Sequence, residues 1–420
     1  MATPSTSAHS KDFALESPEG LRYVARQPIL DLRGHVHGYE LLFRKGYEPA
    51  FCGDVELASR TMLDNAVMFG LEWLTGELPA FFNCTAEVLA TELAGVLPPD
   101  TTVLEILETV EPTPEVIAAC QRLKSQGFRI ALDDFVWSES FTPLVDLADY
   151  IKVDFLRSGA EERRKLFEKL RGKPVKLVAE KVESDEEYRQ ACKEGFTLFQ
   201  GYYFCRPVLM EKRKIPANTI FHLEILKELH HDPLDLDRLC DLVKSDTSIT
   251  YRLLRLVNSP IYAIRHEVRS IHAAMIMVGE ETFRRVATLA IASEMNAARP
   301  AEILRMALVR AEFCELAARH CDLDPTEQYL LGMLSMLTAM LQVPMEAVAP
   351  SLPLRPEIRE ALMGANNRER VPLRWIEAQE QGDWDACDAV IEAAGLKCEE
   401  LFDCFAEAVP WAETALHAVV

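Results

Sequence analysis

The sequence lacks an excess of positive charge. Its 420 residues include 45 Lys and Arg against 66 Asp and Glu, so the formal net charge is -21 at pH 7. A protein that binds nucleic acid polymers without sequence preference needs a basic surface that releases counterions from the phosphates. The composition therefore argues against a nucleic acid polymer as partner. A smaller anionic ligand would need a local cation, either a metal ion or a placed Lys or Arg.

Paired cysteines and a long apolar run are missing as well. The 11 cysteines are scattered, with no C-x-x-C pair and no Cys/His cluster at zinc spacing, which is typical of thiols in a reducing compartment. The longest apolar run, from Tyr329 to Leu341, is too short to span a bilayer. Residues 1–20 lack the apolar segment of a signal peptide. We expect a cytoplasmic protein with a disordered N-terminal tail over 1–20 and no membrane span.

The first half of the chain alternates short apolar segments with helical patterns. Strands are expected at 24–32, 36–43, 80–84, 103–107, 129–135, 150–155, 176–182 and 198–204, and helices at 55–74, 114–126, 160–170 and 185–194. Eight strands with intervening helices in this length predict an α/β fold, a TIM-like (β/α)8 barrel. The first two strands are too close together for a parallel crossover, so one of them is expected to be antiparallel.

Polar side chains lie at or near the ends of these strands. The two carboxylates of Asp133 and Asp134 directly follow a buried run, and alone they could be exposed turn residues. Acids or amides on or just after seven successive strands are harder to assign to chance: Glu40, Asn83, Glu105 with Glu108, Asp133 with Asp134, Asp154 beside Lys152, Glu180 with Glu183, and Gln200. Active sites of such barrels lie at the carboxyl ends of the strands. An oxygen-rich set without His or Cys favours Mg²⁺ or Mn²⁺ over zinc.

The second half changes to an all-helical pattern. Apolar residues recur at helix spacing through 264–278, and further helices are expected at 300–320, 325–341, 356–363 and 373–381. The only His-Asp dipeptide, His231-Asp232, precedes a proline in an expected loop and has no set of partner ligands. We interpret it as part of a linker. A stripe of Met333, Met336 and Met340 is best explained as core, with a partner-binding face as the alternative.

Both halves resemble known families. The run Gln27-Pro28-Ile29 followed by 38–44 resembles the opening of the EAL family of cyclic-di-GMP phosphodiesterases, with Leu41 in place of the signature alanine, and the later polar motifs follow in the family's order over about 22–208. The segment 248–279 resembles the HDOD family, a relative of HD phosphohydrolases that has lost the metal-binding His and Asp residues. The resemblance implies an EAL barrel over 21–208 and an HDOD helical domain over 209–420.

The resemblance also implies roles for individual residues. It implies that Glu40, Asn83, Glu105 and Asp133 hold one metal and that Asp134 holds a second metal or the nucleophilic water. It further implies catalytic roles for Lys152, Glu180 and Gln200, cyclic-di-GMP contacts for Gln27, Leu42, Arg44 and Pro207, and loop-stabilising roles for Glu108 and Glu183. Two Mg²⁺ or Mn²⁺ ions would support hydrolysis to the linear dinucleotide.

Two departures from the family pattern leave hydrolysis open. The loop 136–141 contains no glycine, although active members have a glycine-rich loop there, and Lys181 replaces a glycine between Glu180 and Glu183. Three readings follow: a cyclic-di-GMP hydrolase, a catalytically silent cyclic-di-GMP receptor or scaffold whose HDOD domain binds a protein partner, and an interaction module whose barrel no longer binds nucleotide. Because dimer contacts in the family run through the altered loop, a homodimer is possible in each.

Overall fold

A computed structural model describes residues 24–43, 75–76, 78–91, 93–201, 217–230, 233–262, 267–297, 299–352 and 354–419. The expected tail over 1–20, the expected helix over 55–74, Arg44, Pro207 and the dipeptide His231-Asp232 lie outside the described residues.

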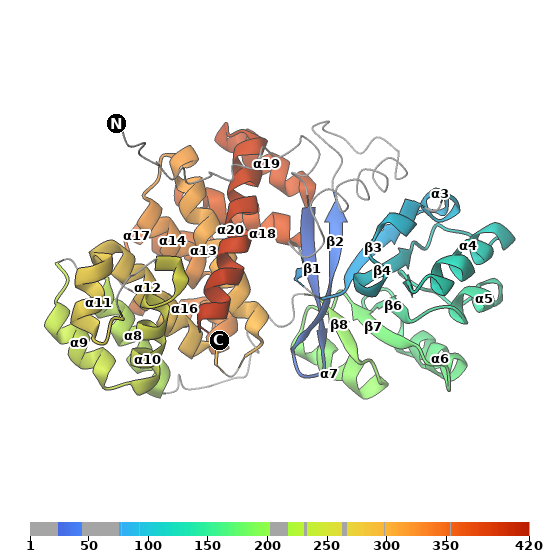
Figure 1. The fold of residues 1–420 in the computed structure, drawn as a ribbon, viewed down its shortest axis with the longest axis horizontal. Helices are drawn as coiled ribbons and strands as arrows, with labels where there is room; N and C mark the ends of the chain where they lie inside the picture. The colour runs from blue at the N-terminus through green and yellow to red at the C-terminus, as the bar shows by residue number, and fades with distance from the viewer. Residues whose placement is uncertain are drawn as a thin grey trace, which may run out of the picture.

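Eight strands close into a barrel in chain order (Figure 1). They are β1 (Val24–Asp31), β2 (Val36–Phe43), β3 (Ala80–Cys84), β4 (Thr102–Ile106), β5 (Arg129–Leu132), β6 (Tyr150–Asp154), β7 (Lys176–Glu180) and β8 (Leu198–Gln200). Strand β1 is antiparallel to both β2 and β8, and the other neighbouring strands are parallel. The predicted barrel with one antiparallel strand is confirmed. Gly34 lies in the short β1–β2 turn with φ of +78°, a conformation that a residue with a Cβ rarely adopts.

Short helices follow the strands around the outside of the barrel. They are α3 (Ala86–Ala90), α4 (Pro114–Ser125), α5 (Thr142–Val145), α6 (Ala160–Leu170) and α7 (Asp185–Glu194), with 3₁₀ turns η1 (Leu93–Val96), η2 (Pro99–Thr101) and η3 (Glu139–Phe141). Ser184 and Glu187 form a capping box at the start of α7, and Gly195 ends this helix in the left-handed region. Strand β5 stops at Leu132, so the expectation that it continues to Phe135 is wrong. The chain turns out of the sheet at Asp134, whose φ is +41°.

The barrel interior consists of an apolar layer with a polar layer above it. The apolar layer is Ile29, Phe81, Val103, Ala131, Tyr150, Val178 and Leu198. Alternate residues of a strand point to the same side, so a step of two residues toward the rim leads to Gln27, Asn83, Glu105, Asp133, Lys152, Glu180 and Gln200. Glu40 pairs with Gln27 in the β1–β2 register and therefore lies at the same level. The apolar layer closes the barrel below, and the polar layer faces its rim.

The C-terminal half is an all-helical domain, as predicted. Its helices are α8 (Ala217–Leu229), α9 (Leu236–Lys244), α10 (Thr247–Val257), α11 (Ile271–Val278), α12 (Glu280–Met295), α13 (Ala301–Cys321), α14 (Pro325–Leu334), α15 (Leu337–Leu341), α16 (Met345–Val348), α17 (Pro356–Leu362), α18 (Val371–Gln381), α19 (Trp384–Ala394) and α20 (Cys398–Val419), with 3₁₀ turns η5 (Pro260–Tyr262), η6 (Ala349–Ser351) and η7 (Arg368–Arg370). The helix expected over 325–341 is broken at Ser335 and Met336. The three methionines are buried, as expected for core residues: Met333, Met336 and Met340.

The helical domain covers the outer face of the β1–β2 hairpin. Figure 1 shows α18 beside β1, and Leu30 of β1 belongs to the hydrophobic core of the helical domain. A two-strand hairpin brings no crossover helix of its own, so this side of the barrel is open to an outside partner. No helix in the described parts of the chain combines the length and apolar character that a bilayer crossing requires.

Candidate metal centre at the barrel rim

The polar layer is centred on the ammonium group of Lys152. Its Nζ lies 2.9 Å from Glu40 Oε2, 2.8 Å from Glu105 Oε1, 3.0 Å from Asp133 Oδ1 and 2.8 Å from Glu180 Oε1. The Lys152 side chain is 1% exposed, so these charges meet away from bulk water. Four strands and the residue directly after β5 thus bring one cation and four carboxylates to one point, as the alternating strand pattern predicts.

This cluster carries more negative than positive charge. Burial by itself would lower the pKa of Lys152, but the charges of Glu105, Glu180, Glu40 and Asp133 raise it well above its usual value. Burial raises the pKa of Glu180 to about 8, although Lys152 opposes this shift, and burial also raises the pKa of Glu105. Crowded carboxylates that resist joint ionisation are stabilised by a further cation.

Several buried oxygen atoms around the cluster have no hydrogen-bond donor among the described residues. They include Asn83 Oδ1, Glu105 Oε2, Asp134 Oδ1, Glu180 Oε2 and Gln200 Oε1. An acceptor buried without a partner is costly, and all of these are the hard oxygen ligands that Mg²⁺ and Mn²⁺ prefer. Within the described ranges, no group of three acidic, His or Cys side chains is arranged so that it could hold a metal ion. The Lys152 ammonium group occupies the position where the four carboxylates meet. The residues fit a divalent cation in type, charge and unmet hydrogen-bonding capacity.

Two glutamines extend the cluster toward strand β1. Gln200 Nε2 donates to Glu40 Oε2 at 2.6 Å and to Gln27 Oε1 at 2.9 Å. Gln27 Nε2 in turn donates to the backbone oxygen of Gln381, at the end of α18, at 3.2 Å. The predicted site residues Gln27, Gln200 and Glu40 are therefore in contact, and the helical domain adds a residue that no local sequence signal indicates.

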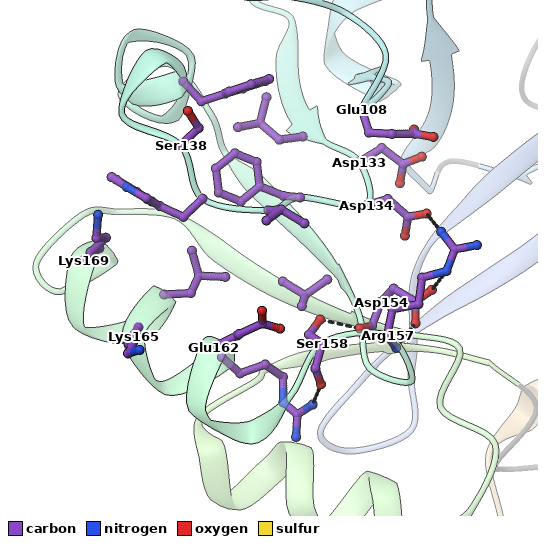
Figure 2. Close-up of a pocket in the computed structure, with 18 of the residues that line it drawn as sticks. Glu108, Asp133, Asp134, Ser138, Asp154, Arg157, Ser158, Glu162, Lys165 and Lys169 are labelled. Atoms are coloured by element: carbon purple, nitrogen blue, oxygen red, sulfur yellow. Dashed lines mark hydrogen bonds and ion pairs between the residues drawn. The ribbon is translucent and has the colours of Figure 1, made fainter.

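A second cluster of charges lies beside the first. Lys181 Nζ is 2.7 Å from Asp154 Oδ2 and 3.6 Å from Asp134 Oδ2, and Arg157 lies 3.7 Å from Asp134 and 3.5 Å from Asp154 (Figure 2). Lys181 has φ of +56° and Asp134 has φ of +41°, so both occupy the left-handed region that favours glycine. Strained backbone of this kind concentrates at functional sites. Arg157 was not predicted, since nothing in its local sequence distinguishes it from a surface cation.

The glycine-free loop packs against the outside of the barrel. The Trp137 ring lies 6.3 Å from Phe135 and carries the Lys169 ammonium of α6 at 4.4 Å, and Trp137 Nε1 donates to Glu139. Between this loop and α6 lies a cavity of about 820 Å³, whose wall includes Asp134 and Glu108 (Figure 2). Trp137 therefore packs toward α6.

The remaining predicted residues lie around this rim. Leu42 is at the end of β2, half-buried, and Glu108 and Glu183 are exposed on the loops after β4 and β7. The backbone N–H of Glu183 donates to Glu187 at 2.8 Å in the first turn of α7. The loop-stabilising roles of Glu108 and Glu183 stay predictions.

Comparisons with known proteins agree with this architecture. A closed barrel with an oxygen-rich rim, followed by a helical bundle, is the arrangement of an EAL domain joined to an HDOD domain. The sequence model of the EAL domain matches residues 83–207, and that of the HDOD domain matches residues 215–349.

Relatives match over nearly the whole chain. The protein "Cyclic di-GMP phosphodiesterase CdgJ" of Vibrio cholerae serotype O1 is 32% identical over 93% of this chain and 92% of its own length. "Uncharacterized protein YuxH" of Bacillus subtilis is 30% identical over 94% of this chain and 99% of its own length. The solved structure of Klebsiella pneumoniae BlrP1 with calcium and cyclic-di-GMP is 25% identical over 46% of this chain and 58% of that chain, with a TM-score of 0.38. The chain belongs to the EAL–HDOD family.

Proposed function

We propose that the barrel binds cyclic-di-GMP and hydrolyses it to the linear dinucleotide with the help of a divalent cation, in a cytoplasmic signalling protein. The observation that carries the proposal is the set of buried acceptor oxygens around Lys152 for which the described part of the chain supplies no donor. The name of the Vibrio cholerae relative supports the choice of substrate. We place the EAL domain at 21–208 and the HDOD domain at 209–420.

In this proposal Glu40, Asn83, Glu105 and Asp133 hold a Mg²⁺ or Mn²⁺ ion. Such an ion, when bound, neutralises phosphate charge and makes a water molecule more acidic. Lys152 offsets the charge of the phosphodiester, and its contacts with four carboxylates hold it in place. Glu180 Oε2, which accepts from no donor in the described ranges, can accept a proton from the attacking water.

The nucleotide would lie above this layer. Leu42 stands near the rim end of β2, whereas Gln27 lies level with Glu40 in the polar layer, and Gln200 links Gln27 to the metal residue Glu40. We propose that Gln200 fixes the relative position of the nucleotide and the metal residues. The ligand-contact roles of Arg44 and Pro207 remain part of the proposal on the resemblance alone.

A second candidate is a cyclic-di-GMP receptor without turnover. Lys181 and Arg157 place two positive charges at Asp134 and Asp154, and the family resemblance implies that Asp134 holds a second metal or the nucleophilic water. In this alternative the helical domain binds a protein partner according to occupancy of the barrel. A homodimer belongs to the proposal in either case.

A product assay separates the two candidates. The full chain is incubated with cyclic-di-GMP and Mn²⁺, and nucleotide binding is measured in parallel with EDTA. Appearance of the linear dinucleotide only with metal is the expected result. Tight binding without product would establish the receptor, and absence of both would reject the proposed function.

Replacement of Lys181 tests the charge cluster at Asp134 and Asp154. In Lys181→Asn the side chain tolerates the left-handed backbone but lacks the charge, so we expect one more Mn²⁺ to bind per chain than in the parent protein. Lys181→Arg keeps a cation there and should leave the stoichiometry unchanged. Calorimetric titration with Mn²⁺ measures this number directly.

The matched control is Lys169→Asn, because Lys169 pairs with Glu139 and stacks on Trp137 away from both aspartates. It should bind as many Mn²⁺ ions as the parent. Equal stoichiometry in Lys181→Asn and the parent would show that Lys181 does not stand in for a metal.

A further inference from the structure

The corner between α18 and α19 contacts the barrel at its rim. Gln379 Nε2 donates to the backbone oxygen of Val24 at 2.9 Å, and the backbone oxygen of Gln381 accepts from Gln27. A Cβ added to Gly382 would lie 2.8 Å from Leu42 Cδ1. Because β1 and β2 are antiparallel, the start of β1 and the end of β2 meet at the rim, so this corner (Gln379–Gly382) borders the polar layer.

A continuous hydrogen-bonded path joins this corner to the metal centre. It runs from Glu40 to Gln200, from Gln200 to Gln27, and from Gln27 to the Gln381 backbone. Both polar atoms of the Gln27 side chain are thus hydrogen-bonded. Its Oε1 accepts from Gln200 of the barrel, and its Nε2 donates to Gln381 of the helical domain. Rotation of Gln27 toward a ligand would break at least one of these two contacts.

The corner is anchored firmly enough to report such a change. The ring of Trp375, in the middle of α18, is completely buried and stacks on Phe313 at 5.1 Å. Gln379 is 1% exposed, so its hydrogen bond to Val24 lies in the interior. The helix behind the corner therefore moves with the core of the helical domain.

We propose that the corner Gln379–Gly382 is a wall of the nucleotide site that couples it to the helical domain, with Gln27 and Leu42 as the positioning residues. The inference rests on the proposed binding of cyclic-di-GMP. A ligand that draws Gln27 or Leu42 toward itself alters their contacts with the corner, and a helical domain that shifts the corner alters the affinity for the ligand. Such coupling is reciprocal.

Two glycines of the helical domain provide a matched pair of variants. Gly382 ends α18 with φ of +69°, and Gly395 ends α19 with φ of +67°. Gly382→Ala and Gly395→Ala impose the same left-handed conformation on a residue with a Cβ. The new methyl group meets Leu42 at position 382, whereas at position 395 no described residue lies within 4 Å.

The expected result is a change in nucleotide affinity in one variant alone. With cyclic-di-GMP, Mn²⁺ and full-length protein, Gly382→Ala should raise the dissociation constant about tenfold, within the range of ordinary coupling between sites. Gly395→Ala should bind as the parent does, and both should show the same loss of thermal stability. A change confined to Gly382→Ala, in either direction, supports the coupling.

Hydrogen exchange provides a second test. If the corner were a purely structural contact, nucleotide binding would not change the exchange rates of its amides. Cyclic-di-GMP should change the exchange of the amides of Gly382, Asp383 and Trp384, which close the corner, and leave that of Gly395 unaltered. If the parent protein binds no nucleotide, the proposed function fails. The coupling is refuted if the parent binds cyclic-di-GMP, the two glycine variants have equal dissociation constants, and the nucleotide leaves amide exchange at the corner unchanged.

Discussion

Glu40→Ala is expected to lower metal-dependent hydrolysis of cyclic-di-GMP more than about 100-fold, since loss of an outer partner of a metal ligand already costs 10–100-fold. The Glu40 carboxylate is buried and touches both Lys152 and Gln200, so the alanine removes a proposed ligand and one end of the glutamine path. The measurement is the rate of linear dinucleotide formation at saturating Mn²⁺.

The control for this variant is Glu186→Ala, on the exposed face of α7. It should retain the parent rate. The thermal midpoint of Glu40→Ala should stay close to that of the parent, because Lys152 keeps three other carboxylates. A folded Glu40→Ala protein with undiminished turnover would remove Glu40 from the proposed metal site.

Glu302→Leu should lower the free energy of unfolding by about 3 kcal/mol, at the lower end of what breaking a buried ion pair costs. Glu302 is 2% exposed and accepts from Arg305 Nε at 2.7 Å and from Tyr39 of the barrel at 3.1 Å. The Tyr39 ring lies 5.2 Å from the Arg26 guanidinium and 5.3 Å from that of Arg305. Among the acidic side chains that the structure describes, leucine leaves Arg305 paired with the more distant Glu413, at 3.6 Å.

Glu327→Leu is the matched control for this substitution. Glu327 also lies in the first turn of a helix and pairs with an arginine, Arg355, but both partners are partly exposed. Its removal should cost less than about 1 kcal/mol. Urea unfolding curves of the two variants give the comparison, and equal losses would mean that the interface pair contributes no more than a surface pair.

The sequence predicts most of the barrel because its signals are local. On β3, β4, β6, β7 and β8 a polar residue lies two positions after an apolar residue of the barrel interior, so the polar layer follows from the strand pattern. The β1–β2 turn is too short for a parallel connection, so the antiparallel strand follows as well. The prediction places the end of β5 too late because an apolar residue, Phe135, follows the two aspartates after Leu132. The positive φ of Asp134 is not visible in the sequence.

Contacts between distant segments could not be predicted. Gln27 and Gln381 are 354 residues apart, and neither segment has a periodicity that indicates the other. Similarly, the sequence shows a tryptophan in the altered loop, but the direction of Trp137 depends on Lys169, which belongs to the next helix along the barrel. Contacts between residues far apart in the sequence determine both the Gln27–Gln381 hydrogen bond and the direction of Trp137. Local sequence propensity carries no information about such contacts.

The most direct test of the account is a calorimetric titration of Mn²⁺ into the parent protein and into Glu105→Gln, with EDTA to reverse binding. Glu105 is fully buried beside Lys152, and glutamine preserves its shape while it removes the charge. We expect saturable Mn²⁺ binding in the parent that weakens at least about tenfold in the variant. Identical titrations for the two proteins, or no binding by the parent, would contradict a metal centre at the barrel rim.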